Sequence, residues 1–597
     1  MPTELQSNVL TANTVKNVMP SCMVYIFVMS ATFLVDTVVS GHFLGTDAVA
    51  AVAMGLPIIG LMIAFTIMIL QGGFLKMLVL MGRSDMEGYQ RIFSLALSLS
   101  ILIDLVFLAL CFFGAESLVN LCGGAKATAQ AAAYGRLYIR TASPMVLFFC
   151  IGSLFQLVLT TYGYQNDRTI CSIVNVTSNV IISVIAIAVL PEEIKIVGLG
   201  IGSAAGAFAQ MITAYILMKR KQISVRYRLY PLNRENLLDT LDCIRRGLPS
   251  SIDIMMDSAC SSIVNNIILA IFLNGTGVLS LVTVIKTLGS LVRTVGKGAM
   301  YSSEPLVAIL FGARDKEGIK KVFRFGTKLG LIYAAAVGAL LFILQTPLLS
   351  FYQVNDSLDA HIGLSLVACS GLVYVFPCMY SAVYEATGHL MLSLLMAAVP
   401  DSILYPILVG ILGKALGVTG IWIAYGYNFI FLFAFYYLLL MLIYKKVPVP
   451  LDAQLMLGKM KNCDAVMDVS IPTDAESVSY VAESLQKFFM DHGSSKKNAY
   501  FSALCMEEIA ADYLAYRRSK AAAGKKTYMD IKAFCDGGRI ELILRNYDDP
   551  YNPLIFEPDP ETFSKIGVSM VQKIAEDITY GYTYHLNVVS VVLNAEG

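Results

Sequence analysis

The stretch that decides the fold occurs twice, as GRSDMEGYQRIF in residues 82–93 and as GARDKEGIKKVF in residues 312–323. Five of the twelve aligned positions are identical: Gly82/Gly312, Asp85/Asp315, Glu87/Glu317, Gly88/Gly318 and Phe93/Phe323. The same offset of 230 residues pairs Gly45-Thr46 with Gly275-Thr276 upstream. Each copy is a charged turn between apolar stretches. The chain therefore predicts two related halves, an arrangement typical of transporters, whose substrate path lies between such halves.

The composition indicates a membrane protein. Hydrophobic residues make up 56% of the chain, charged residues only 15%, and the mean hydropathy is +0.66. A helical span needs roughly 20 mostly apolar residues. We predict a polytopic α-helical membrane protein with about twelve spans in two six-helix repeats, near residues 19–40, 48–80, 92–113, 139–160, 169–190, 197–218, 249–273, 278–310, 327–346, 361–383, 390–413 and 419–444.

The basic residues predict the orientation in the membrane. The connection 219–246 holds eight Lys and Arg residues and the connection 313–328 holds six, whereas 274–277 and 347–361 hold none. Because positively charged loops stay on the cytoplasmic side, both termini are expected to be cytoplasmic in a multi-pass plasma-membrane protein.

Two further classes of site are not indicated by the composition. The twelve Cys residues are scattered and form no CxxC pair, so we expect neither a metal site nor a disulfide framework. The net charge of +1 gives no reason to expect nucleic acid as a partner, and the basic loops are explained by the topology.

The last quarter of the chain has a different composition. After a Pro-rich linker, charge returns in residues 464–597 and no window is long and apolar enough to span a bilayer. The patterns predict a strand (465–470), two helices (474–490 and 497–516), two strands (527–534 and 539–546), a helix (560–577) and two final strands (578–584 and 588–594). We interpret this order as a cytoplasmic α/β sandwich. We divide the chain into an N-terminal six-helix lobe (1–218), a basic cytoplasmic connection (219–247), a C-terminal six-helix lobe (248–446), a linker (447–463) and a cytoplasmic domain (464–597).

Residues 33–52, FLVDTVVSGHFLGTDAVAAV, are similar to the opening of transporters of the multidrug and toxic compound extrusion (MATE) family. The GLGIGSAA stretch from Gly198 and the GVTGIWIA stretch from Gly417 resemble spans 6 and 12 of that family. The major facilitator superfamily was the alternative, but it usually carries a run of basic residues in its charged turn, which residues 82–88 lack. The resemblance covers about residues 15–445.

Asp36 is the first candidate for a coupling site. An ionised carboxylate inside the bilayer costs several kcal/mol unless it meets water, a cation or a partner, so such an acid indicates function. At the 230-residue offset its counterpart is the neutral Asn266. The resemblance implies that Asp36 binds the coupling H⁺ or Na⁺ together with oxygens of Asn175 and Asn179 on span 5. The alternative is that Asp36 only hydrogen-bonds a neighbouring helix.

The second lobe has acids of its own. Asp253 and Asp257 follow Pro249 and share one face of span 7, and Asp257 lies where some MATE proteins place a cation-coupling Glu. Glu385 is the acid that span 10 offers. In the alternative interpretation, Asp253 lies near the cytoplasmic mouth and pairs with a neighbouring arginine, Arg245 or Arg246.

Span 8 carries four charged residues on one helical stripe: Lys286, Arg293, Lys297 and Glu304. Their counterparts at the 230-residue offset are all apolar. Because lipid cannot accommodate such a stripe, we expect it to face the cavity between the lobes or the acids of spans 1 and 7. One interpretation is that these cations neutralise the acids Asp253, Asp257 and Glu304. The other is that the path accepts anionic or zwitterionic cargo.

The tail resembles the ATP-binding fold of anti-sigma-factor serine kinases in three stretches: residues 503–512, 544–554 and 565–571. The pattern departs from that of active members at several positions. The Mg²⁺-binding Asn of the family, four residues after Glu508, is Asp512; its adenine-reading Asp is Asn546; the following Gly is Asp548; and its phosphate-side Gly-x-Gly keeps only Gly567. The resemblance therefore implies a degenerate nucleotide pocket in which ATP–Mg²⁺ binding is weakened or lost.

These observations predict a cation-coupled exporter of small organic molecules that is not an enzyme, requires no cofactor and carries a regulatory domain that contacts a cytoplasmic protein. The alternative is a membrane receptor-kinase, in which the spans sense a ligand and the tail phosphorylates a partner. The altered nucleotide pocket and the duplicated body of spans favour the exporter.

Overall fold

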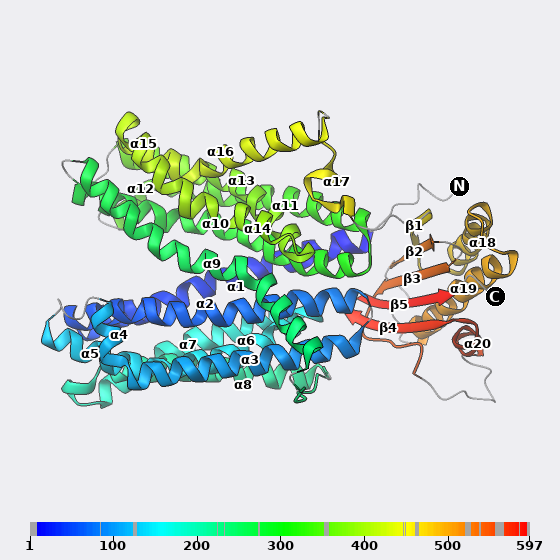
Figure 1. The fold of residues 1–597 in the computed structure, drawn as a ribbon, viewed down its shortest axis with the longest axis horizontal. Helices are drawn as coiled ribbons and strands as arrows, with labels where there is room; N and C mark the ends of the chain where they lie inside the picture. Colours follow the sequence, from blue (N-terminus) through cyan, green and yellow to red (C-terminus); the bar gives the residue numbers. More distant parts are fainter. Residues whose placement is uncertain are drawn as a thin grey trace.

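The computed structural model describes residues 9–83, 85–122, 128–223, 225–231, 233–272, 275–351, 358–445, 447, 449–459, 465–519, 527–536, 539–555, 566–583 and 586–593. A long helical bundle is followed by a small sheet domain that lies against one end of it, which we call the domain end (Figure 1). The side chains of some residues within the helices, among them Asp253 and Asp257, lie outside this description.

The bundle consists of two lobes. Lobe 1 comprises α1 Val9–Phe43, α2 Thr46–Gly82, α3 Met86–Phe113, α4 Ala115–Leu121, α5 Ala129–Ala142, α6 Pro144–Thr161, α7 Gln165–Val189, η2 Glu192–Ile194 and α8 Val197–Arg220. Lobe 2 comprises α9 Arg234–Ile271, α10 Gly275–Gly312, α11 Lys316–Ile343, α12 Gln345–Phe351, α13 Leu358–Thr387, α14 Leu390–Ala397, η3 Pro400–Leu404, α15 Tyr405–Leu416 and α16 Val418–Tyr444. The short α17 Leu451–Gln454 and η4 Leu457–Lys459 lead into the tail.

The duplicated turn has the same structure in both lobes. Asp85 caps α3 by accepting a hydrogen bond from the amide of Gly88 at 2.8 Å, and Asp315 caps α11 through Gly318 at the same distance. An acidic N-cap satisfies an amide that the first helical turn leaves unpaired and interacts favourably with the helix dipole. Helices of 28 residues follow each cap. The predicted internal repeat is thus visible in the local structure.

Each of the twelve predicted windows overlaps one or more helices, and a few of their residues lie in breaks between helices or outside the described residues. Among the described residues, eight helices are long and apolar enough to cross a membrane, and a ninth span consists of α14 and the η3–α15 segment, bent by 43° at the break between them. The other three windows overlap α1, α9 and α10, which have 35, 38 and 38 residues; the window 249–273 extends beyond the end of α9 at Ile271.

The basic connection is shorter than predicted. We expected it to extend to residue 247, but α9 begins at Arg234 because Asn233 caps it, accepting from the amide of Asn236 at 2.8 Å. The first turns of α9 then pair with lobe 1. Lys76 of α2 contacts both Asp239 and Asp242, at 2.9 and 3.0 Å.

The lobes touch directly at the domain end, where α2 and α10 cross. A Cβ atom added to Gly82 would lie 2.0 Å from the carbonyl oxygen of Ile309, and one added to Gly312 would lie 2.2 Å from that of Val79. Only glycine permits backbones to approach this closely. The first residue of each duplicated turn is therefore conserved between the copies because the two helices are in contact there.

The C-terminal domain is a five-stranded antiparallel sheet with strand order β1-β2-β3-β5-β4 and helices on one face (Figure 1). Its elements are β1 Ala465–Pro472, α18 Ala475–Asp491, α19 Lys496–Ser519, β2 Tyr528–Asp536, β3 Arg539–Tyr547, α20 Ile566–Ile574, β4 Asp577–Thr583 and β5 Leu586–Leu593. This order matches the predicted one, except that the helix expected over 560–577 is described only as α20.

The face of the sheet without helices packs against the bundle. Lys532 on β2 and Arg545 on β3 both pair with Asp315 of lobe 2, and the hydroxyl of Thr583 donates to the carbonyl of Thr161 in lobe 1 at 2.9 Å. The domain therefore contacts both lobes at their domain end.

Candidate functional site

Asp36 lies in a buried polar cluster inside lobe 1. Its carboxylate accepts hydrogen bonds from the hydroxyl of Tyr138 on α5 at 2.7 Å and from the hydroxyl of Ser203 on α8 at 2.8 and 2.9 Å. The amide of Asn179 on α7 donates to it at 3.4 Å. Asp36 is only 7% exposed, and its three donors are almost fully buried. Three helices thus direct donors at one carboxylate of a fourth.

Close packing of α7 on α8 places this cluster. A Cβ atom on Gly202 would lie 1.9 Å from the hydroxyl of Ser183, so the helices meet where α8 has no side chain. Ser183 in turn donates to the side-chain oxygen of Asn179 at 3.0 Å, which directs the amide nitrogen of Asn179 toward Asp36. The glycines of the GLGIGSAA stretch therefore bring Ser203 within reach of the carboxylate.

The structure brings Asp36 and Asn179 together as predicted but separates Asn175 from them. Asn175 donates to the side chain of Gln210 at 2.5 Å, one helical turn away from the cluster. Tyr138 and Ser203 were missed. Ser203 lies inside a stretch already singled out by its glycines, whereas nothing in the sequence distinguishes Tyr138 from other tyrosines.

The charged stripe on α10 does not face a single surface, which corrects the prediction. The partner of Arg293 is Asp401 in η3, at 2.9 Å. The guanidinium of Arg293 also donates to the carbonyl of Tyr425 and lies 3.9 Å from the centre of its ring.

The two ends of the stripe point to different surroundings. Lys286 lies over the rings of Tyr405 and Tyr425, inside lobe 2. Glu304 is fully buried and accepts from the side chain of Gln71 on α2, at 3.2 Å, so it contacts lobe 1. Because α10 is long and packs against both lobes, one helical stripe can meet both. The side chains of Asp253 and Asp257 lie outside the described residues, and Arg246 pairs with Asp242.

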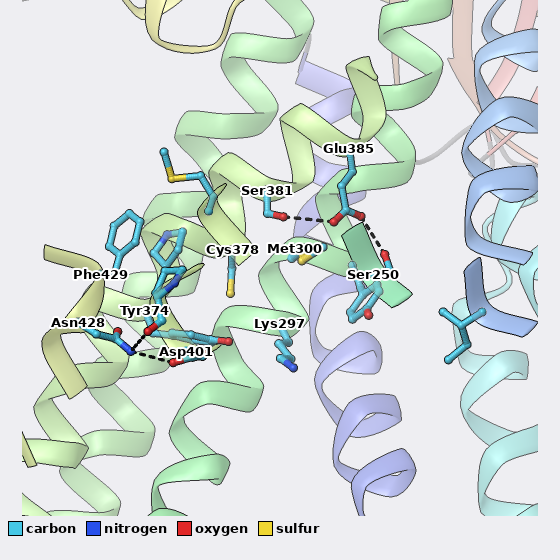
Figure 2. A pocket seen from close by; sticks show the side chains of 15 residues that line it. Ser250, Lys297, Met300, Tyr374, Cys378, Ser381, Glu385, Asp401, Asn428 and Phe429 are labelled. Carbon is cyan, nitrogen blue, oxygen red and sulfur yellow. Dashed lines mark hydrogen bonds between the residues drawn. The ribbon is translucent and has the colours of Figure 1, made fainter. Parts of the chain in front are cut away.

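A cavity of about 130 Å³ lies beside Lys297 in lobe 2 (Figure 2). Its wall carries Lys297 together with two acids, Glu385 and Asp401. Glu385 accepts hydrogen bonds from serines 250, 381 and 393, and Asp401 accepts from Asn428 at 2.9 Å. Ile67 of α2 completes the wall, so the cavity reaches the boundary with lobe 1. It is smaller than the ~300–1,000 Å³ of ligand pockets in proteins.

Comparison with known proteins decides the family. The MatE family model matches residues 20–185 and 249–408, which together are more than half of the chain and lie one in each lobe. The chain belongs to the MATE family of transporters. The curated relative "Probable multidrug resistance protein YoeA" of Bacillus subtilis (strain 168) is 24% identical over 375 residues, covering 60% of this chain and 77% of its own length.

Solved MATE structures share the fold. "Crystal structure of MATE in the bent conformation" superposes with a TM-score of 0.64 at 19% identity, covering 72% of this chain and 94% of the other. "Outward-facing conformation of a multidrug resistance MATE family transporter of the MOP superfamily" gives 0.61 at 18% identity, with the same two coverages. "Reverse polarity of binding pocket suggests different function of a MOP superfamily transporter from Pyrococcus furiosus Vc1 (DSM3638)" gives 0.62 at 18%, again with 72% and 94%.

The MATE match does not extend to the tail, because the family model ends at residue 408. In the tail, the predicted nucleotide residues do lie near one another. Glu508 on α19 packs against Gly567 at the start of α20, where an added Cβ would lie 1.7 Å from the carboxylate. Asn546 accepts a hydrogen bond from Asn587 at 3.0 Å.

The other two residues of the predicted nucleotide pocket, Asp512 and Asp548, contact side chains of the domain itself. The hydroxyl of Tyr551 donates to Asp512 at 2.5 Å, and the Tyr551 ring stacks on Tyr516 at 3.8 Å. Asp548 accepts from the hydroxyl of Tyr513 at 3.0 Å and lies 3.4 Å from Arg517. Asp512 and Asp548 therefore each accept a hydrogen bond from a tyrosine hydroxyl. Within the residues that the structure describes, no group of three His, Cys, Asp or Glu side chains could hold a metal ion.

The contact between the tail and the transporter centres on Asp315, which is fully buried. Burial alone would raise the pKa of its carboxyl. The charges of Lys532 and Arg545 and the amide of Gly318 outweigh that effect and hold the pKa below its ordinary value. Asp315 is therefore ionised at neutral pH and joins α11 to two strands.

Proposed function

We propose that this MATE protein is a cation-coupled antiporter that exports small organic molecules by alternating access, with Asp36 as the coupling residue. The observation that carries the proposal is the cluster around Asp36. A carboxylate buried away from cations keeps its charge only through hydrogen bonds from Tyr138, Ser203 and Asn179. Such a group exchanges an ion with only a modest change in its surroundings.

The geometry favours a proton over Na⁺ as the coupling ion. All three neighbours direct hydrogen atoms at the carboxylate, whereas a sodium ion would need their lone pairs. Protonation neutralises Asp36 and removes the charge that strengthens three hydrogen bonds. Since these bonds tie α1 to α5, α7 and α8, protonation weakens one arrangement of α1 relative to the others. Helix α1 also packs on α10 of lobe 2, so this change reaches the boundary between the lobes.

The conformation described corresponds in this proposal to one in which the cytoplasmic side is closed. We take the domain end to be cytoplasmic, because the basic connections lie there. There the backbones of α2 and α10 touch at Gly82 and Gly312, and Gln71 joins Glu304 across the lobes. Cargo would then enter from the cytoplasm only after these contacts separate.

The cavity in lobe 2 supports a zwitterionic cargo group. One cation, Lys297, and two acids, Glu385 and Asp401, line the same space (Figure 2). Asp401 is already balanced by Arg293. A ligand with one charge of each sign meets a complementary charge in Lys297 and Glu385, whereas a simple organic cation would lie beside the Lys297 ammonium.

The tail acts in this proposal as a regulatory domain of the kinase-like ATPase fold that has lost its nucleotide. Its sheet contacts Asp315 of one lobe and Thr161 of the other, so the docked domain favours the state in which the cytoplasmic ends are together. The hydroxyl of Tyr551 donates a hydrogen bond to Asp512, the acid expected to bind Mg²⁺, which argues against catalysis. A cytoplasmic protein that competes for the sheet face would release the lobes.

Substrate-induced ion flux tests the transport proposal. Purified protein is reconstituted into liposomes with an imposed pH gradient, and a panel of organic cations, anions and zwitterions is added while a pH-sensitive dye reports the gradient. Antiport predicts that at least one compound dissipates the gradient without added Na⁺. Dissipation only when Na⁺ is present would assign sodium coupling, and no dissipation by any compound with either ion would contradict antiport.

A further inference from the structure

A cavity between the tail and the transporter has a volume of about 470 Å³. Its floor is the bare face of the sheet, with residues of β3, β4 and β5, and its roof is formed by the two duplicated turns. Both lobes contribute to the roof: Arg83 comes one residue after Gly82 in lobe 1, and Arg314 comes two residues after Gly312 in lobe 2. The cavity therefore exists only where both lobes and the domain meet.

Arginines dominate the charge of this cavity. Four line it: Arg83, Arg314, Arg539 and Arg545. The acids in its wall are Glu541 and Asp577. Arg545 is balanced by Asp315, but the other three arginines make no ion pair within 4.0 Å among the described residues. The cavity wall thus has more cationic than anionic side chains.

Arg314, in the roof of the cavity, has an unusual backbone conformation. It adopts a left-handed backbone with φ of 54°, a conformation that costs energy for a residue other than glycine. Glu541 lies between Arg314 and Arg539: burial raises the pKa of its carboxyl, and these two cations oppose that rise. Arg314 belongs to lobe 2 and Arg539 to the C-terminal domain, and both line the same cavity.

We propose that this arginine-lined cavity binds a phosphate-bearing anion. Guanidinium groups are planar and offer paired N–H donors that match the oxygens of phosphate, and they keep their charge at any physiological pH. Hydroxyls of Thr579 and Ser590 in the floor supply neutral donors beside them. The volume falls within the ~300–1,000 Å³ range of small-molecule sites, so it accommodates a mononucleotide or a lipid headgroup.

Binding there has a direct consequence for the assembly. Because the wall is shared by lobe 1, lobe 2 and the sheet, an anion in the cavity contacts all three and stabilises the state in which they are together. The site lies on the opposite face of the sheet from Asp512 and Asn546, so it is distinct from the degenerate nucleotide pocket. The inference concerns binding and holds whether or not the domain regulates transport.

Titration of the purified full chain at low ionic strength tests the proposal. The probes are pyrophosphate, ATP without Mg²⁺ and dioctanoyl phosphatidylglycerol, with binding followed by calorimetry and by the rise in Tm. We expect at least one probe to bind, and each of R83Q, R314Q and R539Q to weaken that binding by about tenfold, because each removes a hydrogen bond between charged groups. The Arg314→Lys variant should retain part of the affinity.

The controls separate the two sources of phosphate and the two faces of the sheet. Arg220→Gln removes an exposed arginine at the end of α8, outside the cavity wall, and should leave binding unchanged. Binding of pyrophosphate or ATP assigns a soluble anion, and binding of phosphatidylglycerol alone assigns a lipid headgroup. The proposal is overturned if no probe binds, or if binding is weakened by Asp512→Ala but by none of the three arginine variants.

Discussion

The carboxylate of Asp315, in the turn before α11, lies 3.1 Å from the guanidinium of Arg545 on β3, 230 residues later in the chain. Its duplicate Asp85 makes the same helix cap but is exposed. One copy of a repeated turn has thus acquired a second role as the anchor of a separate domain. The repeat explains the cap, and only the tail explains why Asp315 is buried.

Asp315→Asn should weaken docking of the C-terminal domain. Removing this anion leaves Arg545 buried without its partner, a change that typically costs about 3–5 kcal/mol, and leaves Lys532 paired only with Asp468 at 3.6 Å. Faster hydrogen exchange in β2 and β3 of the full-length variant would report it. Asp85→Asn is the matched control, because it alters the duplicate cap without touching the domain. Equal exchange in the two variants would contradict the anchoring role.

Asp530 on β2 should make the domain less stable as the pH rises. Burial is the main cause that raises the pKa of its carboxyl from 3.8 to about 6, and one of its oxygens has no hydrogen-bond partner among the described residues. Because the folded-state pKa is the higher one, the wild type loses up to about 3 kcal/mol between pH 4 and pH 6. Asp530→Asn should therefore be the more stable protein at pH 8.

Pulse proteolysis of the tail in the full-length protein at several pH values measures this difference. The advantage of Asp530→Asn should shrink toward zero as the pH falls to 4. Asp491→Asn, at the exposed end of α18, is the control and should show no such trend. A variant less stable than the wild type at pH 8 would show that the Asp530 charge is stabilising.

Arg293 and Lys297 should respond differently to the same substitution. Arg293→Gln leaves Asp401 buried without its cation and should destabilise lobe 2 by about 3–5 kcal/mol, a loss that Asp401→Asn in the same chain should partly restore. Lys297→Gln changes the cavity wall and should alter which cargo is carried. Thermal unfolding and transport of charged and neutral analogues distinguish the two. Unchanged selectivity together with poor folding of Lys297→Gln would assign it a structural role.

Local features of this structure could be read from the sequence. The apolar windows and the repeated charged turns are short-range patterns, and Asp36 is singled out by the cost of a charge in a membrane. The expectation that Asn179 lies near Asp36 comes from the resemblance to the MATE family. The strand and helix order of the tail follows from periodicity in the same way. Such local patterns can be recognised in the sequence because they depend little on which other elements pack against the helix or strand.

Contacts between elements that are distant in the chain could not be predicted from the sequence. The ion pair of Arg293 joins α10 to η3, where a bent segment places Asp401 opposite a cation 108 residues away. Tyr138 on α5 reaches Asp36 on α1 in a cluster to which α7 and α8 also contribute, so four helices must pack together to form it. The sheet that contacts Asp315 carries no sequence pattern that identifies its partner. These contacts depend on helix crossing and domain docking, which a single sequence does not specify.

The nucleotide residues of the tail should bind adenosine at most in the millimolar range and show no phosphoryl transfer. Asp512, Asn546 and Asp548 all differ from the active pattern, and each lost contact costs about 1–3 kcal/mol when a buried polar group is left unpaired. Adenosine is the better calorimetric probe because it lacks phosphate groups and so avoids the arginine-lined cavity. Micromolar affinity, or transfer from labelled ATP to a partner serine, would revive the receptor-kinase alternative.

The most direct test of the central claim is proton-driven transport by Asp36→Asn in proteoliposomes. The substitution keeps the shape of the side chain and copies Asn266 of the other lobe, so the variant should insert and unfold at a Tm close to that of the wild type. We predict that it loses gradient-driven accumulation of substrate, and that substrate affinity no longer depends on pH. Ser203→Ala, which removes one donor, should retain coupling. Wild-type flux through Asp36→Asn under the same gradient would contradict the account.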